Sequence, residues 1–213
     1  MRHSALNTIT RISLDAALKE SDDLFEGISD RQFVTFLEGD LVDVEGEPWL
    51  NHSPFIGKRT RRYVESKYHE GMAVPLDEAL GLVRQYKEQH PGSSLGICME
   101  LKAWPSASFT QRAIDQIRDY GFSGDELYFD SFFPHRLMQV RRMAGGEFQC
   151  SYHAGLNIGP LKIGLPFSFR QDIVTVPHKT SFGNPGCPII YGAVGSREVF
   201  EEIVQDPDVV GAY

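Results

Sequence analysis

The stretch Phe-Leu-Glu-Gly-Asp-Leu-Val-Asp-Val at residues 36–44 decides how the rest of the chain is interpreted. Aromatic and aliphatic residues fill most of its positions, which predicts a buried strand. Glu38 and Asp40 stand two residues apart, so a strand places both carboxylates on one face. Two carboxylates in an apolar strand repel each other and resist desolvation, and a bound cation removes both costs. Hard oxygen ligands favour Mg²⁺ or Ca²⁺ over zinc; the plainer alternative is a hydrated acid pair at a strand end.

Strand and helix patterns alternate through most of the chain. Buried apolar runs predict strands, and apolar residues at helical spacing predict the helices between them. The expected strands cover residues 33–44, 49–52, 94–104, 126–132, 148–152, 172–176, 188–194 and 209–213, and the expected helices cover 13–22, 75–90, 109–120, 134–144 and 196–204. Residues 53–72 and 156–169 show no clear pattern.

This alternation predicts an α/β fold in which helical crossovers join parallel strands. With a very short first strand at residues 1–3, and with residues 49–52 counted as the return of a hairpin, the strands number about eight, as a (β/α)₈ TIM barrel requires. We expect a single, small and irregular barrel domain over residues 1–213, because residues 179–187 are too few for a helical crossover. A doubly wound open sheet is the alternative, but no glycine-rich phosphate loop follows any expected strand.

Composition restricts the partners. The 213-residue chain has a formal net charge of −8, which argues against nucleic acid or an anionic membrane as the main partner. Its three cysteines form no CxxC pair, which favours a reducing, cytoplasmic location, and Cys98 lies in an apolar run that predicts a core position. No apolar run is long enough to span a membrane, and no signal peptide is visible. The oligomeric state is not predicted.

Polar residues stand at or near the ends of the expected strands. In a barrel, the carboxyl ends of the strands meet at one face, where active sites lie. Glu100 and Lys102 repeat the two-residue spacing of Glu38 and Asp40 in another apolar run. The residues expected at this face are His3, Glu38, Asp40, His52, Glu100, Lys102, Ser131, Tyr152, His153 and His178.

The order of these residues along the chain resembles the order of the conserved motifs in the glycerophosphodiester phosphodiesterases. That family lies within the wider group of phospholipase-C-like phosphodiesterase barrels. In the order of that family, the chain shows His3, Asn7-Thr8, Glu38-Gly39-Asp40, Asn51-His52, Glu100-Leu101-Lys102 and Ser131-Phe132. It also departs from the family: Ser4 replaces an Arg, Ser53 replaces an Asp, and Tyr191 stands near the position of a Trp.

The resemblance implies a phosphoric diester hydrolase. Glu38, Asp40 and Glu100 would hold one Mg²⁺ or Ca²⁺, and Lys102 would place a positive charge beside the same phosphate oxygens. His3 and His52 would act as general acid and general base, in an order that the sequence does not assign. The residues expected to steer or contact the substrate are Lys58, Arg59, Ser131, His153 and Tyr191.

Three functional readings follow. The first is a metal-dependent hydrolase of lipid metabolism that acts on a small-molecule phosphodiester, such as a glycerophosphodiester or a lysophospholipid. The second is a catalytically inactive barrel that binds a cation or a phosphorylated ligand, having lost activity with the missing Arg. The third is an unrelated α/β enzyme of phosphoryl transfer, which would require a nucleotide and which the absence of a phosphate-binding glycine loop disfavours.

Overall fold

A computed structural model describes residues 34–51, 60–91, 95–102, 106–153, 155–158, 161–164, 172–177, 187, 189–192, 202 and 209–212. Several predictions lie outside these residues: the strand at 1–3, the helix at 13–22, the helix at 196–204 apart from residue 202, and the site residues His3, His52, Lys58, Arg59 and His178.

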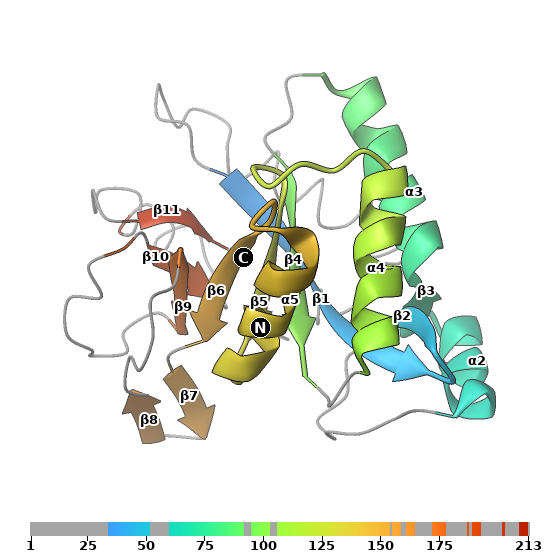
Figure 1. Ribbon diagram of the computed structural model, residues 1–213, viewed down its shortest axis with the longest axis horizontal. Coiled ribbons are helices and arrows are strands. Elements are labelled where there is room, and N and C mark those ends of the chain that lie inside the picture. The colour runs from blue at the N-terminus through green and yellow to red at the C-terminus, as the bar shows by residue number, and fades with distance from the viewer. Residues whose placement is uncertain are drawn as a thin grey trace.

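Strands and helices alternate as expected (Figure 1). The elements are β1 (Val34–Val44), β2 (Glu47–Asn51), α2 (Arg61–His69), β3 (Ala73–Pro75), α3 (Leu76–Gln89), β4 (Gly96–Leu101), α4 (Ala107–Asp119), β5 (Leu127–Ser131), α5 (Pro134–Ala144), β6 (Gln149–His153), β7 (Gly155–Ile158), β8 (Leu161–Gly164), β9 (Ile173–Pro177), β10 (Ile189–Gly192) and β11 (Val209–Ala212). The α/β class is therefore confirmed.

The main sheet has nine described strands in the order β11-β10-β9-β6-β5-β4-β1-β2-β3. Seven of them, β1, β4, β5, β6, β9, β10 and β11, pair in parallel, whereas β2 and β3 continue from β1 as antiparallel strands. β11 also pairs with the first residues of β1, through Val34↔Gly211 and Thr35↔Ala212. The described parallel strands number seven, because the expected first strand at residues 1–3 lies outside the described residues, so they do not make up the eight-stranded barrel that we expected.

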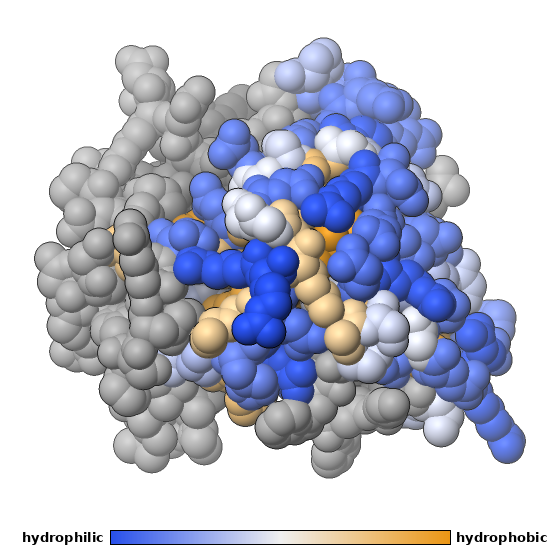
Figure 2. Space-filling model, in the orientation of Figure 1, coloured by the Kyte–Doolittle hydropathy of each residue, from blue (hydrophilic) through white to orange (hydrophobic). Residues whose placement is uncertain are grey.

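Alternate strand residues give the sheet an apolar and a polar face. Helices α3, α4 and α5 lie side by side over the apolar face (Figure 1). The main hydrophobic cluster joins strand residues such as Ile97, Met99 and Phe129 to helix residues such as Leu80 and Ile114. The outward side of α3 and α4 is mostly hydrophilic (Figure 2), as amphipathic helices over a sheet require. This arrangement directs the intervening strand residues, including the predicted acids, to the opposite face of the sheet.

The helix α2, the short strand β3 and the β7–β8 hairpin are elements that the sequence pattern did not reveal. α2 lies within residues 53–72, where no periodicity was visible, because Val64 is its only buried residue. Val64 belongs to a small apolar cluster with Val42, Val44, Trp49 and Ala73, so α2 is held by the β1–β2 hairpin and β3. β7 and β8 form a separate antiparallel hairpin within or beside the unassigned residues 156–169. None of the helices in the described ranges is long and apolar enough to cross a membrane.

Candidate metal centre

Three carboxylates gather on the polar face of the sheet. Glu38 and Asp40 lie on β1, and Glu100 lies on β4 directly opposite Asp40 in the parallel register. One carboxylate oxygen from each of the three residues lies within 4.8 Å of the others. The side chains of Asp40 and Glu100 are buried, and Glu38 is half-buried. The structure therefore brings together the three acids that the sequence predicted.

Lys102 lies against the same cluster, one residue beyond β4. Its ammonium nitrogen is 3.0 Å from Oδ2 of Asp40 and 3.4 Å from Oε2 of Glu100. Burial opposes the charged form of Lys102, but Glu100 and Asp40 outweigh burial and raise the pKa of the ammonium above its ordinary value. Lys102 is thus a fixed positive charge at the site.

One lysine does not balance the acids electrostatically. Burial, followed by repulsion from Asp40, raises the pKa of Glu38 to about 7. The same two causes raise the pKa of Glu100 well above its ordinary value. Both carboxyl groups therefore hold a proton more tightly than an exposed acid does, which shows that negative charge is unfavourable here without a further cation.

The donor set fits a divalent metal ion. Oε1 of Glu100 is buried and accepts no hydrogen bond from the described residues. Three carboxylates and one ammonium leave an excess of two negative charges when all are ionised, which a divalent cation would neutralise. Carboxylate oxygens are also the ligands that Mg²⁺ and Ca²⁺ prefer. Glu38, Asp40 and Glu100 could therefore hold a metal ion.

A fourth acid, Asp130, extends the row of carboxylates. It lies on β5 opposite Glu100 in register, and its side chain is fully buried. Oδ2 of Asp130 is 2.9 Å from Nδ1 of His153, at the end of β6. Sequence reasoning placed His153 at the site but overlooked Asp130. The signal was present, because Asp130 is a single acid in an otherwise apolar strand, as Glu100 is in β4.

Other predicted contacts lie elsewhere. Ser131 is fully buried, and strand alternation turns it away from the face that carries Asp130. Its hydroxyl donates to the Leu101 carbonyl oxygen at 2.9 Å and accepts from the Phe133 N–H at 3.1 Å. Tyr191 lies on β10, where the structure describes only its backbone.

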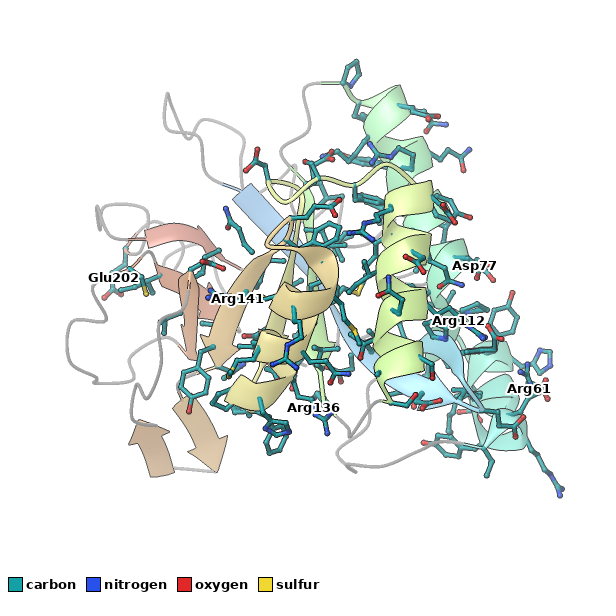
Figure 3. The ribbon with its side chains drawn as sticks, viewed as in Figure 1. Arg61, Asp77, Arg112, Arg136, Arg141 and Glu202 are labelled. Atoms are coloured by element: carbon teal, nitrogen blue, oxygen red, sulfur yellow. The ribbon has the colours of Figure 1, made fainter. Side chains whose placement is uncertain are left out.

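The basic stretch at residues 58–62 is described only in part. Its Arg61 begins α2 at the outer edge of the molecule (Figure 3). The Arg61 guanidinium pairs with the exposed carboxylate of Glu45 at 3.4 Å. This part of the stretch is therefore a solvated ion pair at the surface.

Comparison of sequences identifies no relative: no family model matches the chain, and no curated protein matches it. Comparison with solved structures finds proteins of the same fold. A Silicibacter pomeroyi DSS-3 protein described as a glycerophosphoryl diester phosphodiesterase superposes with a TM-score of 0.64 at 17% identity, over 99% of this chain and 86% of its own. The chain has the fold of these phosphodiesterases.

A second solved structure agrees. An Oleispira antarctica phosphodiesterase, solved in complex with the product sn-glycerol-3-phosphate, superposes with a TM-score of 0.66 at 14% identity, over 97% of this chain and 85% of its own. The resemblance to the glycerophosphodiester phosphodiesterases, inferred from scattered motifs, is thus confirmed for the fold. At these identities the likeness bears on the fold, and the reaction depends on the site.

Proposed function

We propose that the chain is a metal-dependent phosphodiesterase that hydrolyses a glycerophosphodiester or a related phospholipid-derived diester. The observation that carries this proposal is the cluster of Glu38, Asp40 and Glu100 around Lys102, on the polar face of a sheet that phosphodiesterases share. The product found with the Oleispira antarctica protein supports the choice of a glycerol-containing substrate.

The three carboxylates would hold Mg²⁺ or Ca²⁺. When bound, such an ion would offset the negative charge that develops on the phosphate oxygens in the transition state. Lys102 is the chain's own contribution to the same task, because its ammonium stands beside two of the proposed ligands. It would donate hydrogen bonds to the phosphate once the metal had replaced it as the partner of the acids.

His3 and His52 complete the proposal as the general acid–base pair, with one accepting the proton of the attacking hydroxyl or water and the other protonating the leaving alkoxide. Lys58, Arg59, His153 and Tyr191 are proposed to steer or contact the substrate. Ser131 was predicted with them, but it is buried and turned away from the acids, so we do not include it. These assignments come from the family resemblance and from strand-end positions in the sequence. A single barrel domain over residues 1–213 and a cytoplasmic location stay predictions of the same kind.

The test is hydrolysis of a panel of diesters that includes bis-nitrophenyl phosphate, glycerophosphocholine and a lysophospholipid. Each assay is run with Ca²⁺, with Mg²⁺ and with chelator, for the unmodified chain, for Glu38→Gln and for the exposed control Glu65→Gln. The proposal expects turnover that needs the metal and Glu38 and is insensitive to Glu65. Absence of turnover, with a metal-dependent rise in melting temperature, would support the inactive cation-binding barrel instead. Absence of both turnover and a metal-dependent rise in melting temperature would mean that the three carboxylates do not form a metal site.

A further inference from the structure

Asp130 and His153 form a carboxylate–imidazole pair beside the metal cluster. Nδ1 of His153 lies 2.9 Å from Oδ2 of Asp130, whose side chain is fully buried. An ionised carboxylate only accepts hydrogen bonds, so Nδ1 carries the proton of this contact. In the neutral imidazole, the lone pair is then on Nε2, which becomes a hydrogen-bond acceptor of fixed identity.

The His153 ring is also held in orientation. The ring of Phe132 stacks against it, with 4.1 Å between ring centroids and 29° between planes. A ring that is tied at one nitrogen and covered on one face has little freedom to rotate. The side chain of His153 is 13% exposed, and within the described part of the chain its only hydrogen bond is the one through Nδ1. Nε2 is therefore presented in a defined direction with its acceptor capacity unused by these residues.

The pair borders the proposed substrate position. Asp130 lies opposite Glu100 in the β4–β5 register, and opposite Ser151 in the β5–β6 register. His153 lies two residues beyond Ser151, on the same face of β6 and at its carboxyl end. Both members of the pair are close enough to Glu38 to affect its pKa, since Asp130 raises it and His153 lowers it. The pair thus continues the row of acids along the polar face.

We propose that His153 contacts the substrate directly, with Nε2 accepting a hydrogen bond from a hydroxyl of the alcohol portion, and that Asp130 is the positioning residue that fixes this acceptor. The inference rests on the proposed function for the kind of ligand. A hydroxyl is the better partner because it can donate to Nε2, whereas ester and phosphate oxygens only accept. The site is therefore suited to phosphoesters of a polyol rather than of a simple alcohol.

The test compares binding of two phosphate monoesters, sn-glycerol 3-phosphate and n-propyl phosphate, by calorimetry on the chain loaded with Ca²⁺ or Mg²⁺. The two ligands share the phosphate and the three-carbon chain and differ in the hydroxyls. We expect the unmodified chain to prefer the glycerol ester by roughly tenfold, the size of one hydrogen bond. His153→Ala and Asp130→Asn should bring the ratio of the two affinities to about one and leave the affinity for n-propyl phosphate within about threefold.

Asp130→Asn tests positioning because an Asn amide can donate to Nδ1. That contact moves the proton of the neutral ring to Nε2 and removes the acceptor. The matched control is His135→Ala, which removes an exposed histidine from α5 and should preserve the ratio. If Asp130→Asn does not fold, the ratio for His153→Ala decides.

Three outcomes would each overturn the inference. The unmodified chain could bind the two esters equally, it could bind neither, or His153→Ala could retain the tenfold preference. Its failure is separable from failure of the proposed function. If the chain shows the preference but hydrolyses no diester, the His153 contact is supported and the proposed enzymatic function is contradicted. If the chain hydrolyses diesters but shows no preference between the monoesters, the proposed enzymatic function is supported and the His153 contact is contradicted.

Discussion

Asp40 and Glu100 are direct neighbours in the parallel register of β1 and β4, and the Lys102 ammonium contacts both, at 3.0 Å and 3.4 Å. Two buried carboxylates this close are unfavourable unless positive charge accompanies them. Lys102 supplies part of that charge. This relationship leads to predictions about metal binding, pH, the lysine and the local backbone.

Removing one proposed ligand should abolish the response to metal. For the unmodified chain we expect Ca²⁺ or Mg²⁺ at about 100 times the dissociation constant to raise the free energy of unfolding by about 2.7 kcal/mol. Glu100→Gln keeps the size of the side chain but removes a charged ligand, so the metal should raise the melting temperature little or not at all. Differential scanning fluorimetry with metal and with chelator measures this. Glu65→Gln, on the exposed side of α2, is the control and should respond as the unmodified chain does.

Stability of the metal-free chain should fall as the pH rises. The folded protein raises the pKa of Glu38 from 4.5 to about 7, so between these values the folded state binds more protons than the unfolded state. The free energy of unfolding therefore decreases through this window. Glu100 contributes in the same direction, since its pKa is also raised.

Melting in chelator from about pH 5 to about pH 8 checks this dependence. Glu38→Gln removes one titrating group and should flatten the decrease. Saturating metal should reverse it, because metal binding requires the ionised carboxylates. If the stability measured in chelator is unchanged over this pH range, or increases with pH, Glu38 is not held in this unfavourable environment.

Loss of the lysine charge should destabilise the metal-free chain. Lys102→Met keeps much of the aliphatic stem and leaves Asp40 and Glu100 without their shared ammonium. We expect a loss of roughly 1.5–3 kcal/mol in chelator, typical of a hydrogen bond to a charged group, and partial recovery when metal is added. Chemical denaturation measures both values.

The control for Lys102 is Lys67→Met on the surface of α2. Lys67 pairs with Glu70 at 2.6 Å, and the Glu70 side chain is 45% exposed, whereas Asp40 and Glu100, the partners of Lys102, are 1% and 3% exposed. An exposed pair of this kind is worth between about 0 and 1 kcal/mol, so the control should change stability little. Equal effects of the two substitutions would contradict the distinction between a lysine that serves two buried carboxylates and a lysine paired with an exposed one.

A side chain at Gly39 should destabilise the chain. A Cβ at this position would lie 3.0 Å from Cδ1 of Leu50, which is fully buried in the hairpin strand. Gly39→Ala should therefore cost about 1–3 kcal/mol through overpacking, and it should weaken metal binding because Glu38 and Asp40 flank the displaced backbone. Gly81→Ala provides the contrast. Its Cβ would meet Tyr120 at an ordinary 3.4 Å, and alanine within a helix should stabilise by about 0.5–1 kcal/mol, as thermal melting of both variants would show.

Local patterns predicted much of this molecule. Strands around residues 36–44 and 94–104 were expected from apolar runs, and α4 and α5 were expected from helical spacing with their ends correct to within about two residues. The burial of Cys98 was also expected and is confirmed. α2 was missed because a helix that buries one residue has no apolar stripe. The hairpin of β7 and β8 was missed because its short strands lie among glycines and prolines that obscure any period of two.

The sequence by itself determined that Glu38 and Asp40 share a face, as do Glu100 and Lys102, because a side-chain period of two is a local property of any strand. Only the tertiary structure decided that Asp40 stands opposite Glu100, that Asp130 follows in the same row, and that His153 contacts Asp130. Register joins residues far apart in the chain and depends on how whole strands pack their apolar faces against the helices. The acids were visible along the chain, and the site exists because packing across the sheet brings them together.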